Sequence, residues 1–357
     1  MIRKYIRWIF KALQDEVTAV PGKVIALLFF IAMLLLPVFT VQPHILRIFT
    51  LAAVFAIYAS SWDLLAGFTG QVNLGHALFF GVAAYASAML NIYLDFPPWI
   101  TIPLGGISAV LVGLIAGLPA LRLRGFYLSL VTLGFPVILT GIIYVFPDFT
   151  GGEMGLYGVE RLSLSRTLDY YIVVLVMMGS LLLMLKLTDA TSKIIRTGVI
   201  LHAIREDEIT ARASGIHTTR YKLLAFASSG FFAGIAGGIY AHYMRIAGPS
   251  TLDLFFSFEA IIWTIFGGMT TIYGAVVGVF ILHPLVEFVR LYEWGGQFRY
   301  ILLALILVIT LLFMPEGIGV WVRDKIEIKC PRCKLINITI RRSCRACGAG
   351  LHLQKED

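Results

Sequence analysis

Four cysteines near the C-terminus have the residue type and the spacing of a metal site. They form two C-x2-C pairs, Cys330 with Cys333 and Cys344 with Cys347, and ten residues separate the pairs. Each pair presents two thiolates from one tight turn, and four soft thiolates suit a closed tetrahedral Zn²⁺ site. Four protein ligands leave no open position for catalysis. The spacing predicts a structural zinc ribbon, with a redox pair or an unmetallated tail as alternatives.

A charged segment, residues 188–222, is the second candidate for function. It carries six basic and four acidic side chains, and uncharged apolar runs flank it. If residues 202–215 form one helix, a single face contains Ile204, Glu208, Ala211 and Gly215. The acidic cluster of Glu206, Asp207 and Glu208, with Arg205 and Arg212 nearby, favours charged hydrogen bonds to a partner protein. A solvated loop that only joins two spans is the alternative.

The third candidate is a polar, glycine-rich segment at residues 62–77, between two apolar runs. Backbone that leaves a helix inside a bilayer must be shielded by protein or water, and freed N–H groups at helix ends receive carboxylates. The segment is therefore a candidate solute contact, and residues 265–275 have similar glycine spacing. The candidate pathway residues are Asp63, Gly67, Gly70, Gln71, Asn73, Gly75, His76, Gly267 and Gly268.

A packing role competes with this pathway role. In that interpretation the glycines allow close helix contact, and His76 and Asn73 satisfy each other or a carbonyl group. The functional interpretation depends on Asp63 and His76, since ionisable groups at membrane depth are costly and are usually functional or paired. The sequence leaves both interpretations open. Three further residues near span ends are expected to snorkel to the interface: His242, Arg245 and His283.

The chain that positions these three candidate sites is strongly apolar. Of its 357 residues, 59% are apolar and 14% are charged, and its mean hydropathy is +0.85, which excludes an ordinary soluble domain. Because one helical crossing needs ~20 apolar residues, we expect an all-α polytopic membrane protein with about eight to ten spans. Apolar runs lie at 24–42, 45–62, 74–94, 99–119, 126–147, 170–187, 223–243, 255–282 and 300–314.

Basic residues predict the orientation, because Lys and Arg collect in cytoplasmic loops. Segments 1–23, 188–222 and 323–357 are each net basic, whereas the loop at 148–169 is net acidic. We therefore expect both termini and the charged segment on the cytoplasmic side of the cell membrane. Nine crossings would place the termini on opposite sides, so one apolar run must contain an additional turn. The expected place is 255–299, which glycine and proline interrupt.

The chain thus divides into three parts. These are a basic cytoplasmic N-terminus at 1–23, a membrane domain at 24–319 that includes the 188–222 segment, and a cytoplasmic ribbon-like tail at 323–357. Basic side chains beside the cysteines are expected to contact anionic lipid or a protein partner rather than a specific nucleic acid. They are Arg341, Arg342 and Arg345.

Five ordered blocks resemble the LivM-type permeases of ABC importers for branched-chain amino acids. REDEITARASGI at 205–216, followed by 219–226, is similar to their cytoplasmic coupling loop, and LLAGFTGQ at 64–71 with NLGHA at 73–77 is similar to their glycine segment. The other blocks are LRLRGFYL at 121–128 with 131–134, TGGEMG at 150–155, and GGMTTIYGA at 267–275. The resemblance leaves out the cysteine tail.

The resemblance implies a permease subunit without enzymatic activity. It would pair with a second permease subunit, two ATP-binding subunits and an external solute-binding protein, and Glu208, Ala211 and Gly215 would lie in a helix that docks on the ATPase. The chain itself contains no G-x-x-x-x-G-K-[ST] phosphate loop, so ATP hydrolysis belongs to another polypeptide. We expect Gly215→Trp and Glu208→Lys to fold but to impair transport. Branched-chain amino acids are the implied cargo, with urea or short amides as alternatives.

Two other classes of function remain as alternatives. An ion-coupled secondary transporter would use Asp63, Glu259 or Glu287 as a proton or sodium site and would need no ATP. An intramembrane enzyme is disfavoured, because the sequence contains no H-E-x-x-H motif and no G-x-S-x-G motif.

Overall fold

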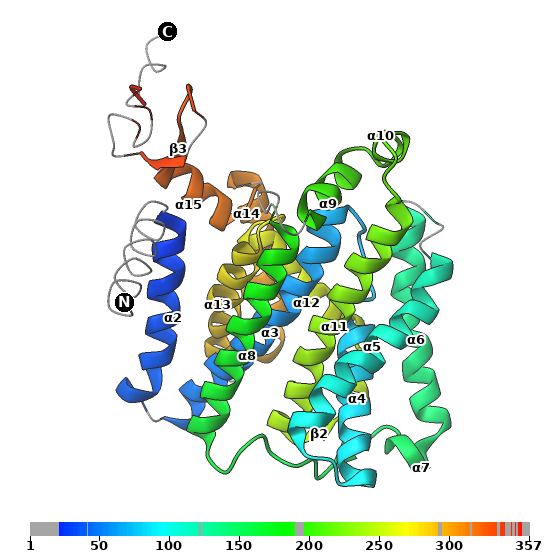
Figure 1. The fold of residues 1–357 in the computed structure, drawn as a ribbon. Coiled ribbons are helices and arrows are strands. Elements are labelled where there is room, and N and C mark those ends of the chain that lie inside the picture. The colour runs from blue at the N-terminus through cyan, green and yellow to red at the C-terminus, as the bar shows by residue number, and fades with distance from the viewer. Residues whose placement is uncertain are drawn as a thin grey trace, which may run out of the picture.

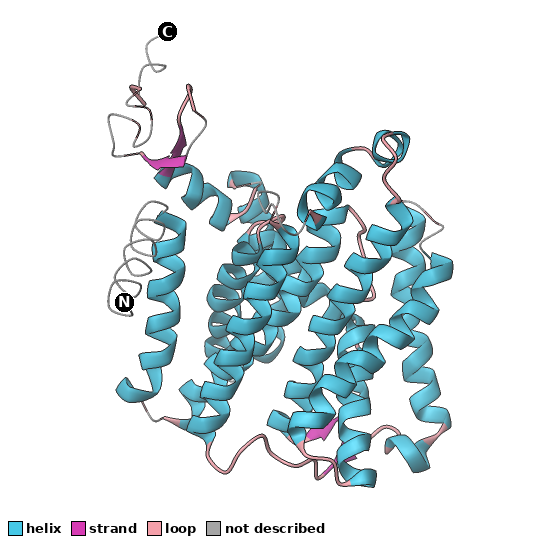
Figure 2. Ribbon diagram, in the orientation of Figure 1, coloured by secondary structure: helices cyan, strands magenta, loops and turns pink. Residues whose placement is uncertain are grey.

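The computed structural model describes residues 21–351 apart from 41, 121, 122, 124, 190–195, 292–294, 315, 334, 335, 340–343, 345, 346 and 348. The basic residues of segment 1–20 and Arg341, Arg342 and Arg345 lie outside the described residues. Helices make up most of the described part (Figure 2), together with two small antiparallel strand pairs. The expected all-α membrane architecture is confirmed.

The long helices follow the apolar runs. They are α2 (Pro21–Phe39), α3 (Pro43–Thr69), α4 (Ala77–Leu94), α5 (Pro98–Ala120), α6 (Phe126–Val145), α8 (Arg166–Thr188), α11 (Thr218–Met244), α12 (Leu254–Gly267), α13 (Ile272–Val289) and α14 (Gly295–Phe313). Eight candidate membrane spans are found in the described residues, and α2 and α12 contain shorter apolar helices. This agrees with the expected eight to ten spans.

The apolar run expected at 255–282 is two helices, α12 and α13, joined by a turn at 268–271. At the start of α13, Gly274 packs against Gly267 and lies close to Gly319 of α15 (Ile318–Ile326). Further along α13, Phe280 stacks with Phe49 near the beginning of α3, so α13 runs back across the bundle. The additional turn expected within 255–299 is therefore present.

Short elements gather at the two ends of the bundle (Figure 1). At the end that we call the α10 end lie α9 (Thr197–Glu206), α10 (Glu208–Ala213), α15, β3 (Glu327–Lys329) and β4 (Ile336–Ile338). At the opposite end, called the α7 end, lie α7 (Pro147–Thr150), β1 (Leu156–Tyr157) and β2 (Ile246–Ala247). The 3-10 helix η1 (Pro249–Leu252) follows β2, packs against α4 and α6, and precedes α12. The charged segment and the cysteine tail therefore share one end.

Helix α3 is the central element. In its apolar window 94% of the residues are buried, against 28% in that of α6, and α3 packs against α8, α11, α12 and α13. The outer helices expose many large apolar side chains, as expected for surfaces that face lipid or another membrane subunit. Helix α3 therefore connects the packing of most of the bundle.

Candidate functional site

Residues 202–215 do not form one helix, contrary to the expectation. The chain is extended at Asp207, which separates α9 from α10 and caps the latter. The Asp207 carboxylate accepts hydrogen bonds from the N–H groups of Thr210 at 3.1 Å and Ile209 at 2.8 Å, and from the Thr210 hydroxyl at 2.8 Å. These bonds, that of the Thr210 N–H first, lower the pKa of Asp207 because they favour the charged carboxylate.

Glu208 is directed toward α11 of its own chain. Its carboxylate forms ion pairs with Lys222 and Arg212, each at 3.0 Å, and Thr218 donates a hydrogen bond to it at 3.4 Å. The Lys222 side chain is only 11% exposed, and Ala211 is buried beside this cluster. The first residue of α10 is thereby fastened to the first two turns of α11.

The outer surface of α10 carries an exposed apolar residue. Ile209 is 68% exposed, with Asp207, Arg212 and Gly215 exposed around it. Gly215 has a φ of 84°, and a Cβ placed there would meet no atom within 4 Å. Its glycine therefore serves the left-handed turn after α10 and not a close contact within the chain. Sequence reasoning missed Ile209, although an apolar residue directly after four charged residues is a usable signal.

Helix α9 connects α10 with the end of α3. The ring of His202 lies 5.4 Å from that of Phe68 in the last turn of α3. A Cβ at Gly70, the residue that ends α3, would lie 3.8 Å from Arg205 Cγ. Ile204 is buried on the same helix. A continuous series of contacts therefore leads from α10 through α9 to the central helix.

Residues 70–76 leave α3 and run back into the bundle as non-helical backbone. The Trp62 indole donates to the Asn73 carbonyl at 2.7 Å, and the Asn73 side chain accepts a hydrogen bond from the Gly75 N–H at 2.9 Å. The packing interpretation suggested that Asn73 and His76 bond to each other or to a carbonyl group. The structure shows no bond between these two side chains. Side chains of this chain replace water for the broken backbone, as a membrane interior requires.

Helix α6 closes over this segment. The Thr132 hydroxyl accepts a hydrogen bond from the Leu74 N–H at 3.1 Å, and the Ser129 hydroxyl donates to the Val72 carbonyl at 2.9 Å. A Cβ at Gly75 would collide with the Thr132 carbonyl. Gly75 therefore allows the close approach of α6, as the packing interpretation predicts for this glycine.

Two side chains of the segment have buried polar atoms without a hydrogen-bond partner among the described residues. His76 is fully buried, with Nε2 2.9 Å from Ser61 Oγ and its ring stacked on Tyr58 at 4.8 Å. Within the described residues, His76 Nδ1 and Gln71 Oε1 are buried and have no hydrogen-bond partner. Because an unsatisfied buried polar atom is costly, these two atoms are the best candidates in this segment for contact with a transported solute or with water.

Asp63 belongs to a different site, a joint between helices. It is fully buried, and Oδ1 accepts a hydrogen bond from the Thr270 N–H at 2.8 Å in the turn between α12 and α13. A Cβ at Gly67 would collide with the Asp63 carboxylate. Gly267 and Gly268 pack against α13 and α15 in the same place. The expected pathway residues thus fall into two groups, one at 70–76 and one in this joint.

His242 is inside the protein and does not snorkel, so that prediction was wrong. Its Nε2 lies 2.7 Å from Thr101 Oγ1 and 3.1 Å from Ser87 Oγ, and its Nδ1 lies 2.7 Å from the Glu160 carbonyl. These partners come from α5, α4 and the loop that follows β1. His283 is buried as well. Only the tertiary fold brings such partners together, so a histidine near a span end does not reveal them in the sequence.

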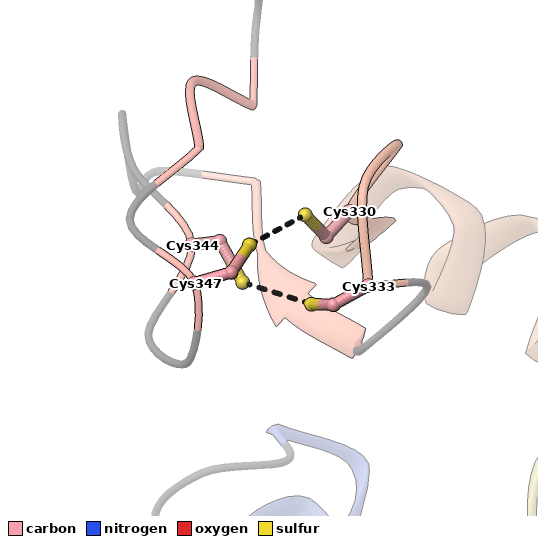
Figure 3. Close-up of side chains that lie close together, drawn as sticks. All are labelled: Cys330, Cys333, Cys344 and Cys347. Atoms are coloured by element: carbon pink, nitrogen blue, oxygen red, sulfur yellow. Dashed lines mark hydrogen bonds between the residues drawn. The ribbon is translucent and has the colours of Figure 1, made fainter.

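The four cysteines of the tail converge, as Figure 3 shows. Their sulfur atoms all lie within 4.8 Å of one another, and the pairs Cys330–Cys347 and Cys333–Cys344 are each 3.5 Å apart. Zinc–sulfur bonds of ~2.3 Å in a tetrahedron place sulfurs about 3.8 Å apart, so the cluster fits a metal ion. The N–H of Cys333 lowers the pKa of Cys330, which favours the thiolate form that binds metals.

Comparison with known proteins gives a match over most of the chain. Residues 44–311 match the family described as branched-chain amino acid transport system / permease component. The high-affinity branched-chain amino acid transport system permease protein LivM of Escherichia coli is 28% identical over 330 residues, 85% of this chain and 77% of that protein. LivM of Salmonella typhimurium is 28% identical over 334 residues, 86% and 78% of the two chains.

A relative with another printed cargo also matches. The ribose import permease protein RbsC of Haemophilus influenzae is 25% identical over 277 residues, which cover 75% of this chain and 83% of that protein. No solved structure matches the chain. The family match ends at residue 311, before α15 and the cysteine tail.

Proposed function

The chain belongs to the family of branched-chain amino acid transport permease components, and from this premise we propose that α10 is the element through which an ATPase moves the membrane helices. The chain is a permease component of an ABC importer and not an enzyme. Its cargo is a branched-chain amino acid or a related small solute. The name of LivM gives branched-chain amino acids and that of RbsC gives ribose, so the relatives do not narrow the cargo further.

The attachment of α10 supports this proposal. A docking element must present an exposed surface and must also be joined firmly to the helices that it moves. Ile209 supplies the exposed apolar contact, and the ion pair between Glu208 and Lys222 joins α10 to α11. Through α9 the same element reaches the end of α3, at Phe68. Force on α10 therefore has two routes into the bundle.

The partners follow from the class of importer. We propose a second permease subunit beside this one, two ATP-binding subunits and an external solute-binding protein. The chain is a multi-pass membrane protein, and we propose that the α10 end is cytoplasmic because the net basic segment 188–222 lies there. The outer helices with large exposed apolar surfaces are available for the second permease and for lipid.

We propose that the solute passes beside residues 70–76. His76 Nδ1 and Gln71 Oε1 are the buried atoms of this segment that still lack a partner among the described residues, and they can bond to a polar solute as it passes. The joint at Asp63, Gly67, Gly267 and Gly268 has a separate role: it holds α3 to α12, α13 and α15. This division favours packing for Gly67, Gly267 and Gly268. Asp63 remains a candidate for solute contact as well, because its Oδ2 is buried and has no partner among the described residues.

For the tail we propose a structural Zn²⁺ ion bound by Cys330, Cys333, Cys344 and Cys347. The sulfur separations support a four-coordinate site, and four thiolates select a soft or borderline metal such as zinc. A closed set of four ligands supplies no chemistry to transport itself.

Reconstitution tests the transport proposal. The chain is placed in liposomes together with its second permease and ATPase subunits, and labelled leucine is offered with the external binding protein. We expect uptake that depends on ATP and is abolished when the ATPase is inactive. Urea and ribose are offered in parallel to separate the alternative cargoes.

The same liposomes distinguish an ion-coupled transporter. In that case the chain alone would accumulate solute from a proton or sodium gradient, and substitution of Asp63 would abolish the accumulation. Accumulation by the chain alone would refute the proposed function.

A further inference from the structure

Helix α15 is attached at its first residues to the joint around Asp63. It begins after Gly317, which has a φ of 86° and packs directly on Gly268. Two residues later, Gly319 lies against Gly267 and Gly274, which flank the turn between α12 and α13. A side chain at either Gly317 or Gly319 would collide with this turn between α12 and α13. The start of α15 therefore rests on backbone that also binds the Asp63 carboxylate.

The other end of α15 is attached to the cysteine ribbon. Strand β3 begins at Glu327, directly after the helix ends at Ile326. Thr339, which follows β4, donates its N–H to the Ile326 carbonyl at 2.8 Å and its hydroxyl to the Lys325 carbonyl at 3.0 Å. These bonds satisfy two of the carbonyl groups that a helix end leaves free. The ribbon therefore caps the last turn of α15.

Among the described residues of the ribbon, the buried apolar cluster is small. It consists of Cys330, Cys344 and Leu351, with Ile328, Cys347 and Ala349 partly buried against it. A unit of this size does not bury enough apolar surface to fold alone, and such units generally depend on a bound metal. Loss of the metal would therefore unfold the ribbon and remove the cap from α15.

We propose that metal binding by the four cysteines is a latch that holds α15 against the turn between α12 and α13. This inference depends on the zinc site proposed above. In the metal-loaded protein, α15 supports the joint to α3 at the α10 end, and transport proceeds. In the metal-free protein, α15 detaches from the joint and coupling between ATP hydrolysis and transport falls. The family match ends at residue 311, before these residues.

The test uses the full importer in nanodiscs. Zinc is removed from the unmodified protein with a chelator, and the metal content, hydrogen exchange of residues 318–329 and the transport rate are measured before and after. We expect one zinc per chain, at least tenfold faster exchange in α15 after its removal, and a severalfold lower transport rate. Added Zn²⁺ should reverse both changes.

Two variants separate the loss of the metal from the loss of the contact between α15 and Gly267. Cys330→Ser should behave as the chelated protein does. Gly319→Leu should keep its zinc but lose the contact with Gly267, so that transport falls while the metal content does not. Arg332→Ala, on the exposed first knuckle, is the matched control and should change neither quantity.

The outcomes are distinct. If zinc is bound but its removal changes neither exchange in α15 nor transport, the latch is wrong and the zinc site stands. If the intact importer binds no zinc, the zinc assignment and the latch both fall, whereas ATP-dependent uptake would still support the permease function.

Discussion

Ile209 is the residue on which the docking proposal depends most. It is exposed, and a large apolar side chain in such a position is a typical anchor of an interface. We expect Ile209→Asp to reduce ATP-driven uptake at least tenfold and to leave the folded subunit unchanged, because Ile209 packs against little of its own chain. Uptake assays and thermal unfolding of the purified subunit measure the two effects.

The matched control for Ile209 is Leu164, which is fully exposed in the loop before α8. Leu164→Asp introduces the same charge at the opposite end of the bundle and should leave uptake unchanged. Equal losses in both variants, or none in Ile209→Asp, would exclude α10 as the docking surface.

The ion pair between Glu208 and Lys222 should act as one unit. The sequence suggested that Glu208→Lys would fold normally, but the structure changes this expectation, since the new lysine would meet Arg212 and Lys222. We expect Glu208→Gln and Lys222→Gln each to cost about 1–3 kcal/mol of folding free energy and to uncouple ATP hydrolysis from uptake. The double variant should cost far less than the sum. Additive losses in this cycle would mean that the pair does not join α10 to α11.

Asp207 makes α10 sensitive to acid. Its pKa is lowered in the folded protein, so its capping contribution is present above the ordinary aspartate value and is lost as the pH falls through the lowered pKa. We expect pepsin to cleave residues 208–214 increasingly as the pH is lowered through this window. Asp207→Asn still accepts the N–H bonds but does not titrate, so its cleavage, compared at each pH, should not show this increase. Identical pH profiles would contradict the role of the cap.

At the scale of elements, the joint between α3 and the turn of α12 and α13 depends on the absence of a side chain at Gly67. Gly67→Ala would push a methyl group into the Asp63 carboxylate and the Thr270 backbone. Overpacking of this kind costs about 1–3 kcal/mol, and we expect a lower melting temperature and lower uptake.

Gly141 provides the control for this substitution, because it lies within α6 and a Cβ there would meet nothing within 4 Å. Gly141→Ala should be neutral or slightly stabilising, since alanine is the better helix former. A Gly67→Ala variant as stable as Gly141→Ala would show that the joint tolerates movement.

Hydropathy predicted most of the helices, because burial in a membrane demands long apolar runs whatever the tertiary fold. It did not predict the break at Asp207, because local hydrogen bonds cause it. The Asp207 carboxylate accepts bonds from the N–H groups of Ile209 and Thr210, and a new helix begins there. Nor did it predict that Glu208 points inward, because its partner Lys222 is fourteen residues away. The cysteine cluster was predictable, since spacing alone places two cysteines on each turn.

The candidate pathway was only partly predictable for the same reason. Glycine-rich composition located both broken segments, yet it could not separate residues that line a route from residues that permit contact. Gly75 and His76 are neighbours in the sequence, but a Cβ at Gly75 would meet α6, whereas His76 Nδ1 has no partner among the described residues. Partners from distant helices decide between the two roles, and a single sequence does not reveal them.

At the scale of the whole molecule, the fold makes a prediction about the two faces of the membrane. The α10 end carries the proposed ATPase contact and the cysteine tail, and the α7 end carries the loop that contains Leu164 (Figure 1). If the proposed orientation is correct, a membrane-impermeant maleimide applied to intact cells should label Leu164→Cys strongly. Ser214→Cys, on the exposed turn after α10, should be labelled only after the membrane is opened.

The unsubstituted chain gives the background from its four native cysteines, which metal binding should protect from the reagent. The charge distribution supports this orientation, because the basic excess of segment 188–222 opposes the acidic loop at 148–169. An ATPase in the cytoplasm can reach α10 only if that end faces inward. Labelling of Ser214→Cys in intact cells would therefore overturn both the orientation and the route by which ATP hydrolysis is proposed to drive this permease.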